Sequence, residues 1–212
     1  MKNYIETKEK EPKEILYATQ NAAKLLTLKN ILGHAYKIVS LKDVGIESQT
    51  EEGGVDPKEN ALKKARYCFQ MTGRDSFSMD FGFFIEGLSK NEQPGSSVKS
   101  LVPISREREP TDEEILDFYK SLIFRLGGKV NAYWLRALAY VSKDGEYIKE
   151  TKIPKILVST PHWTRFKGFP MTSIQLDPRT GKYESEMTEE EKRESHKDED
   201  EILKNFIKEH TS

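Results

Sequence analysis

The sequence predicts an α/β fold built on a long mixed β-sheet that is flanked by helices. Three observations support this prediction. Residues 14–41 follow a strand, turn, helix, strand order, which is typical of α/β proteins. Residues 76–84, SFSMDFGFF, are nearly all aromatic or apolar, as expected of a buried strand. Residues 130–158 contain two strand-like runs around the turn-forming segment SKDGE, which predicts a long hairpin.

The first three elements lie close together in the chain. EILYA, residues 14–18, is a short apolar run that suits a buried strand. Apolar residues then recur at helical spacing in 21–32, and Gly33 is a natural end for that helix. YKIVSL, residues 36–41, predicts the second strand.

A polar loop at 48–56 leads into a second helix. Asp56 suits the N-cap position and Pro57 the first helical position, so we expect a helix from Pro57 to about Met71. The aromatic strand at 76–84 follows it.

The second half begins with a long polar loop at 89–110. TDEE, residues 111–114, has the capping-box pattern and precedes a further predicted helix. Pro154, in the second strand of the hairpin, indicates a sheet edge or a bulge. Residues 186–210 are highly charged, and we expect them to be helical toward their end.

Composition limits the class of protein. The chain has 212 residues, a formal net charge of -1 and 10% aromatic residues, which favours a folded domain over a disordered chain. The balanced charge gives no general attraction to nucleic acid or anionic membranes, so we expect neither as a partner. Cys68 is the only cysteine, which fits a cytoplasmic location.

The N-terminus has no targeting pattern. Residues 1–13 are polar and charged and lack the apolar stretch of a signal peptide, so we expect a flexible leader. No apolar run approaches the length of a membrane span. We expect residues 14–212 to form one domain.

The turn after the first strand is a candidate anion site. Free N–H groups at a helix N-terminus favour anions. Thr19 and Asn21 add polar side chains there, and Lys24 lies one helical turn further on. The simpler interpretation is that Thr19 or Asn21 caps the helix and that Lys24 is solvated.

Asp80 is a carboxylate in the middle of the aromatic strand. Because side chains alternate along a strand, Asp80 shares a face with Ser78 and Gly82, opposite Met79 and Phe81. A buried carboxylate without a partner is costly, so we expect a cation or a lysine beside it. A purely structural salt bridge would also satisfy this requirement.

Two further groups of charged residues are candidates. Glu52 precedes two glycines, and a carboxylate on such a turn can bind a hard cation. Lys64 shares a helix face with Asn60. EKRESHK, residues 191–197, brings His196 close to lysines and can contact polar edges of a ligand. In each case the alternative is a charged, solvated helix surface.

Taken together, these segments resemble the inosine triphosphate pyrophosphatase family, hydrolases of non-canonical purine nucleoside triphosphates. The matching segments, in order along the chain, are TQNAAK (19–24), Glu52 with ENALKKA (59–65), MDFGFFIEGL (79–88), Pro94-Gly95 and EMTEEEKRESHK (186–197). The resemblance implies an elongated α/β fold of two lobes with a central cleft. It also implies a homodimer and Mg²⁺-dependent hydrolysis of a nucleoside triphosphate such as ITP, XTP or dITP to the monophosphate and pyrophosphate.

The resemblance also implies roles for individual residues. Asp80 would accept the proton of the attacking water and, with Glu52, would bind the metal. The residues implied for phosphate binding are Thr19, Asn21, Lys24 and Lys64. Those implied near the base are Phe166, Phe169, Lys192, Ser195, His196 and Lys197.

The chain departs from the family pattern beside Asp80. Met79 stands where relatives usually have a second acid, and Phe81 stands where they usually have a hydroxyl residue. The sequence therefore leaves open an alternative function, in which a catalytically impaired relative binds a nucleotide as a sensor or interaction module.

Overall fold

The computed structural model describes residues 12–47, 56–104 and 108–211. Glu52 and most of the predicted leader lie outside these ranges. The predictions for Glu52 and for residues 1–11 therefore stay predictions.

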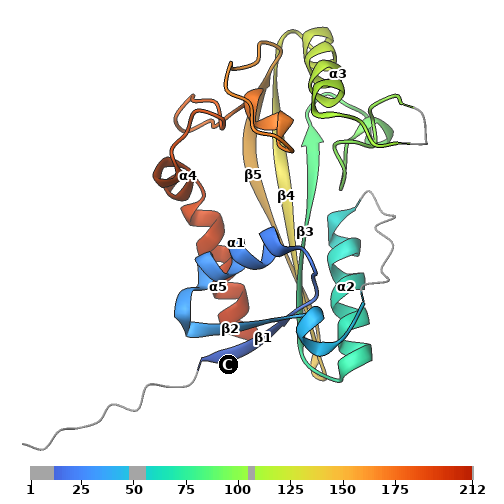
Figure 1. The fold of residues 1–212 in the computed structure, drawn as a ribbon, viewed down its shortest axis with the longest axis vertical. Coiled ribbons are helices and arrows are strands. Elements are labelled where there is room, and N and C mark those ends of the chain that lie inside the picture. Colours follow the sequence, from blue (N-terminus) through green and yellow to red (C-terminus); the bar gives the residue numbers. More distant parts are fainter. Residues whose placement is uncertain (1–11, 48–55, 105–107, 212) are drawn as a thin grey trace, which may run out of the picture.

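The core of the molecule is a six-stranded mixed sheet with the strand order β2-β1-β3-β4-β5-β6 (Figure 1). The pairs β1–β2 and β1–β3 are parallel, whereas β3–β4, β4–β5 and β5–β6 are antiparallel. The strands are β1 (Lys13–Tyr17), β2 (Tyr36–Ser40), β3 (Ser76–Ile85), β4 (Lys129–Ser142), β5 (Gly145–Val158) and β6 (Gln175–Leu176).

Five α-helices lie in the described part of the chain. They are α1 (Ala22–Leu32), α2 (Pro57–Thr72), α3 (Asp112–Arg125), α4 (Glu189–Ser195) and α5 (Lys197–His210). The side chains of Asn21, Asp56 and Thr111 cap the first three, as the sequence predicts. None of the described helices is long and apolar enough to span a bilayer.

The helices cover both faces of the sheet (Figure 1). Helices α1 and α5 pack on one face over a cluster that includes Leu28, Phe77 and Leu203. Helix α2 covers the opposite face through Ala61 and Ala65. Helix α3 lies at the far end of the long strands, over a separate core.

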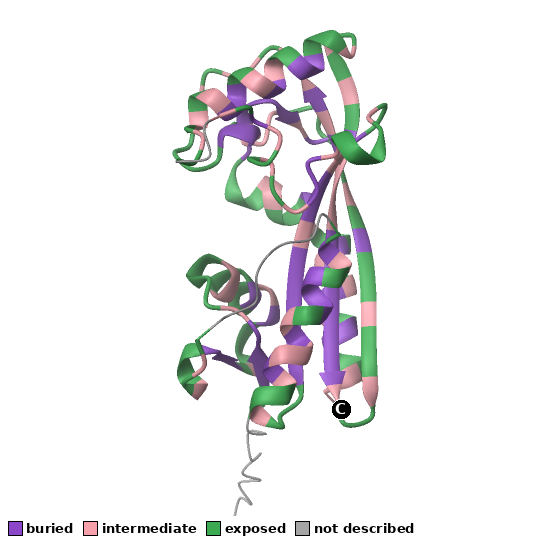
Figure 2. Cartoon of the chain, turned by 90° about the vertical axis from the view of Figure 1, so that its right-hand side faces the viewer, coloured by how far each residue is buried: buried purple, intermediate pink, exposed green. Residues whose placement is uncertain are grey.

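The two longest strands connect these cores. Strands β4 and β5 each have 14 residues and pair along their whole length. In Figure 2 the strands are largely buried where helices cover them, and the outer surfaces of the helices are exposed. Leu138 of β4 belongs to the core under α1 and α5, whereas Ala132 belongs to the core under α3. One continuous hairpin thus joins both ends of the molecule.

The predicted fold class, a mixed sheet flanked by helices, is confirmed. Two details differ from the sequence prediction. The first strand begins at Lys13, inside the predicted leader. The charged segment near the C-terminus forms two helices, because α4 ends at Ser195 and α5 begins at Lys197, with His196 between them. At Pro154, β5 pairs with β4 alone among the described strands, because β6 pairs only with Ile156 and Leu157. This agrees with an edge position.

Candidate active site

Asp80 lies between two lysines from different helices. Its side chain is buried, with 5% of the residue exposed. Oδ1 is 3.4 Å from Nζ of Lys24 and 3.2 Å from Nζ of Lys64. Oδ2 is also buried, and it has no hydrogen-bond partner among the described residues. The carboxylate is therefore neutralised on one oxygen and open on the other.

The sheet topology brings these three residues together. β1 pairs with β3 only as far as Phe77, so the edge of β3 near Asp80 is not covered by a strand on that side. Helix α1 begins just after β1 and carries Lys24 to this edge. Ligands of α/β proteins commonly bind at the carboxyl ends of parallel strands, where such an edge opens.

Close packing of α2 on β3 positions Lys64. The hydroxyl of Ser78 donates a hydrogen bond to the carbonyl of Ala61 at 2.5 Å. A Cβ at Gly82 would lie 2.9 Å from Phe84 and 3.0 Å from Pro57, so only glycine permits this approach. Ser78, Asp80 and Gly82 therefore share the face of β3 that α2 covers, as strand alternation predicts.

The polar side chains of the turn before α1 mainly make hydrogen bonds that cap the helix. Oδ1 of Asn21 accepts hydrogen bonds from the N–H groups of Ala23 and Lys24, at 2.9 and 3.2 Å. Oγ1 of Thr19 accepts one from the N–H of Asn21 at 3.2 Å. Thr19 and Asn21 thus shape the turn in this state, and Lys24 is the group that reaches Asp80.

The negative charge of Asp80 also acts on Tyr17. The hydroxyl of Tyr17 is buried without a hydrogen-bond partner among the described residues. Burial, and secondly the charge of Asp80, raises the pKa of this phenol well above its ordinary value. Tyr17 is therefore uncharged throughout the physiological pH range.

A cavity of about 640 Å³ lies beside this strand. Met79 and Phe81, the neighbours of Asp80 in the sequence, are in its lining. The other lining residues come from α1, Val98, β4, β5, the segment 168–175, residue Glu184, helices α4 and α5 and His196 between them. This volume suits a ligand of the size of a small organic molecule.

The structure brings some of the residues predicted near the base into this cavity. Phe169, Lys192 and His196 line it. Ser195 does not line it; this residue is buried, and its hydroxyl donates a hydrogen bond to Asp177. Ser195 thereby fixes the junction between α4 and α5.

Phe166 and Lys197 are not in the cavity lining. The ring centroid of Phe166 is 5.6 Å from Nζ of Lys192, a cation–π contact. Lys197 is exposed, and its Nζ is 3.4 Å from Glu194.

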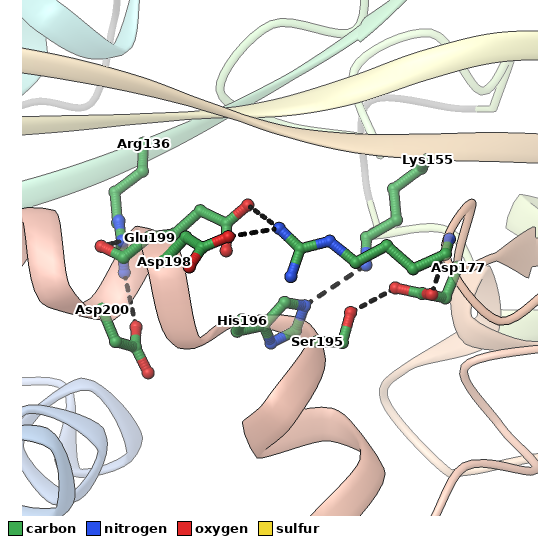
Figure 3. Close-up of polar contacts among 9 residues, drawn as sticks. Arg136, Lys155, Asp177, Ser195, His196, Asp198, Glu199 and Asp200 are labelled. Atoms are coloured by element: carbon green, nitrogen blue, oxygen red, sulfur yellow. Dashed lines mark hydrogen bonds and ion pairs between the residues drawn. The ribbon is translucent and has the colours of Figure 1, made fainter.

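The polar residues of the cavity that were not predicted from the sequence include Arg136, Lys155, Gln175 and Glu184. Arg136 and Lys155 are 4% and 3% exposed, and Figure 3 shows their polar contacts. Each is a charged residue inside a predicted strand, the same signal that singled out Asp80. Strand alternation applied to Arg136 would have placed it on the face of Leu138, opposite the face that α2 covers.

These buried charges are paired. NH1 of Arg136 is 3.0 Å from Asp200, and NH2 donates a hydrogen bond to the carbonyl of Glu199. Nζ of Lys155 is 2.5 Å from Glu184 and 3.3 Å from Nε2 of His196. Burial and the positive charge of Lys155 together lower the pKa of His196 below its ordinary value, although nearby carboxylates oppose this shift.

Fold and site together define an α/β protein in which a buried carboxylate on the α2 face of β3 contacts two lysines, while a polar-lined cavity lies against the opposite face of the same strand. Residues 15–199 match the family model described as Ham1 family. Since this match covers most of the sequence, the chain belongs to the Ham1 family, and the resemblance found in the sequence is confirmed.

Curated relatives cover almost the whole chain. The dITP/XTP pyrophosphatase of Thermoanaerobacter sp. (strain X514) is 29% identical over 197 residues, which are 92% of this chain and 96% of the relative. The dITP/XTP pyrophosphatase of Leptospira interrogans serovar copenhageni is 29% identical over 204 residues, or 92% of this chain and 98% of the relative.

Solved structures show the same fold. A HAM1 protein from Coxiella burnetii superposes with a TM-score of 0.75 at 21% identity, covering 92% of this chain and 98% of that one. The Ham1 protein of Staphylococcus aureus superposes with a TM-score of 0.73 at 18% identity, covering 93% and 100% of the two chains.

Proposed function

We propose that this protein hydrolyses nucleoside triphosphates with non-canonical purine bases, such as ITP, XTP and dITP, to the monophosphate and pyrophosphate. The observation that carries the proposal is the position of Asp80, buried between Lys24 and Lys64 beside a cavity of about 640 Å³. The name of the curated relatives, dITP/XTP pyrophosphatase, supports this substrate class.

The two lysines are suited to hold the phosphate groups. Phosphoryl transfer depends on positioning and on neutralising charge more than on covalent chemistry of the protein. Lys24 and Lys64 come from separate helices and meet at one point, so an incoming phosphate can contact both. Thr19 and Asn21 contribute the shape of the turn from which Lys24 projects.

Asp80 is suited to take a proton from the attacking water. Its lysine partners contact Oδ1 only, and Oδ2 has no partner among the described residues. When the lysines bind phosphate they can leave Oδ1, so both carboxylate oxygens become available to the attacking water. Asp80 is thus prepared as a base by the same contacts that bind the substrate.

The residues present fit a magnesium ion that is bound jointly with the substrate. Mg²⁺ commonly uses one or two carboxylates together with substrate phosphates, rather than a cage made only of protein groups. In the described part of the chain no three His, Cys, Asp or Glu residues form a metal cluster. Oδ2 of Asp80 offers one open carboxylate oxygen, and Glu52 would supply a second group. The ion would neutralise charge on the phosphates and on the leaving pyrophosphate.

The cavity is suited to hold the base. Phe169 offers an aromatic surface for stacking, and Lys192 and His196 offer polar contacts at its edge. We further propose that Phe166, held by Lys192, and the Ser195–Lys197 segment complete the surroundings of the base. Ser195 would act through its bond to Asp177 rather than by contact.

A second candidate function is nucleotide binding without hydrolysis. Met79 and Phe81 flank Asp80, line the cavity and offer no metal ligand. A protein of this kind would bind the same nucleotides through Lys24 and the cavity but would release them unchanged.

Two measurements distinguish the candidates. The purified chain is incubated with ITP, XTP, dITP, ATP or GTP and Mg²⁺, and pyrophosphate is quantified; binding is followed by calorimetry in parallel. Pyrophosphate release from the non-canonical nucleotides supports the hydrolase. Binding without release would support the second candidate, and neither binding nor release by folded protein would exclude both.

We also propose that the protein is a homodimer, as the family resemblance implies, and that it is cytoplasmic, as its single cysteine indicates. Sedimentation of the purified chain tests the assembly, since a monomer at micromolar concentration would contradict it. Cell fractionation tests the location.

A further inference from the structure

Lys155 is the most deeply buried cation of the cavity, and the proposed reaction gives it no role. It projects from β5 and is 3% exposed. Its ammonium group lies 2.5 Å from Oε1 of Glu184, so the lysine is held as a cation by a carboxylate. Its second contact is with Nε2 of His196 at 3.3 Å, as Figure 3 shows.

This second contact determines which nitrogen of His196 carries the proton. An ammonium group has three hydrogen-bond donors and no acceptor. Nε2 can therefore interact favourably with Lys155 only through its lone pair. A proton on Nε2 would face the N–H groups of Lys155, so the ring must be neutral and must carry its proton on Nδ1.

The charges around His196 support a neutral ring. Lys155 from β5 opposes protonation, and Arg136 from β4 is paired with Asp200. The carboxylates of Glu184, Glu199 and Asp200 favour protonation, yet burial and Lys155 outweigh them and lower the pKa of the imidazole.

His196 also lines the cavity, and no described residue accepts a hydrogen bond from its Nδ1. We infer that Lys155, itself held by Glu184, is a positioning residue that locks His196 as a neutral Nδ1–H donor toward an acceptor atom on the ligand. The inference rests on the proposed function for the identity of that ligand, an oxo-purine nucleotide. The neutral Nδ1–H tautomer of His196 is a property of the free protein and does not depend on the ligand.

The first experiment determines the tautomer of His196 in the free protein, without any reaction. Ring nitrogens of uniformly ¹⁵N-labelled protein are observed by long-range ¹H–¹⁵N correlation, and a His196→Asn variant assigns the signals. We expect Nδ1 of His196 to carry the proton and Nε2 to have the shift of a nitrogen lone pair, at pH values from about 7 to 8. A ring protonated on Nε2, or an even mixture of the two tautomers, would overturn the inference.

The second experiment removes the positioning group. In Lys155→Met we expect the His196 pKa to rise, because one of the two causes that lower it is gone, and we expect the proton to redistribute between both nitrogens. Lys149→Met is the matched control, because Lys149 is an exposed lysine on the same face of the same strand. If the variant fails to fold, Lys155→Arg, which keeps a cation with donors only, should retain the tautomer. Unchanged His196 signals in folded Lys155→Met would contradict a positioning role.

The third experiment adds a ligand. IMP, a product of the proposed reaction, is titrated into the labelled protein, and the Nδ1–H signal of His196 should shift. With ITP as substrate, Lys155→Met should lose roughly ten-fold or more in kcat/KM, as expected for a lost charge-assisted contact, while Lys149→Met stays near the wild type. If His196 carries its proton on Nδ1 but IMP does not shift the Nδ1–H signal, the proposed contact with the ligand is wrong. If the protein does not hydrolyse ITP but IMP shifts the His196 signal, the proposed activity is wrong. The Nδ1–H tautomer and its contact with the ligand would still hold.

Discussion

Asp80 is a buried carboxylate that contacts one lysine from each of two helices. A buried charge without a partner would be costly. Lys24 and Lys64 offset this cost, and both are themselves partly hydrated, with 25% and 12% of their side chains exposed. In the proposed function, the lysines would exchange a carboxylate contact for a phosphate contact without leaving any charge isolated in an apolar environment.

Replacing Asp80 by asparagine tests its role as a base. Asparagine keeps the shape but cannot accept the proton, so we expect the rate of ITP hydrolysis to fall about 10²- to 10⁴-fold. Because both lysines can turn to solvent, the free energy of unfolding should change by less than about 2 kcal/mol. Steady-state kinetics and urea unfolding measure the two effects.

The control for Asp80→Asn is Glu146→Gln, which removes an exposed carboxylate 2.6 Å from Arg66. This variant should keep the wild-type rate. A fully active Asp80→Asn protein would show that another group activates the water.

Lys24 offers a separate test of phosphate binding. Lys24→Ala removes one of the two charges beside Asp80, and a charge-assisted hydrogen bond to phosphate is worth roughly 1.5–3 kcal/mol. We expect the KM for ITP to rise about ten-fold or more. Lys29→Ala, at an exposed lysine of the same helix, is the control. Equal kinetics for both variants would remove Lys24 from the phosphate site.

Residue-level prediction succeeded where the signal was local. The faces of the strand at 76–84 follow from simple alternation, which placed Asp80 correctly beside Gly82. Strand alternation could not identify the contact between Lys155 and His196. These residues are 41 positions apart and meet only after the sheet and the C-terminal helices pack together. Arg136 shows the same limit, since its partner Asp200 is 64 positions away.

At the scale of elements, helix starts were the most predictable features. Asp56 and Thr111 begin their helices at the predicted residues, because a cap is a contact within three or four positions. The break at His196 was not predicted. The segment around it is highly charged, and the bond from Ser195 to Asp177, which lies at the break, joins residues 18 positions apart.

The contact between α2 and β3 can be tested at Gly82. A methyl group there would lie 3.0 Å from the ring of Pro57 and 2.9 Å from Phe84, so Gly82→Ala should push the start of α2 away. We expect a loss of about 1–3 kcal/mol in the free energy of unfolding, typical of overpacking. Activity should fall as well, because Lys64 moves with the helix.

A double-mutant cycle separates this effect from general damage. Pro57→Ala removes the ring that the new methyl group would meet. In the double variant, the loss from Gly82→Ala should therefore be smaller than in the wild-type background. Strictly additive losses would show that the two residues do not limit each other.

For the whole molecule, the position of the cavity is the main result that the sequence did not contain. Its lining combines Thr27 of α1 with Lys192 of α4 and residues 168–172, which are far apart in the chain. A ligand in the cavity would therefore connect elements from both ends of the sheet, and this arrangement depends on strand order, which local patterns do not specify.

Ligand binding should consequently stabilise the entire fold. At a concentration of about 100 Kd, a ligand that binds only the folded state adds roughly 2.7 kcal/mol. For a chain of this size, IMP should raise the melting temperature by about 5–10 °C. Differential scanning calorimetry measures the shift. Lys192→Ala should reduce it at equal IMP concentration, whereas an equal shift in this variant would exclude Lys192 from the ligand site.

The uninterrupted pairing of β4 with β5 also limits how the gene can change. A single inserted codon within β4 would turn every later residue of the strand to the opposite side of the sheet. If it fell just before Arg136, this guanidinium would face α2, and the alanines that now pack under α2 would face the cavity. Differences in length among relatives should therefore be confined to the turn at 143–144 and to the loops beyond the strands. Libraries that randomise insertions along the chain should return active clones only at those positions.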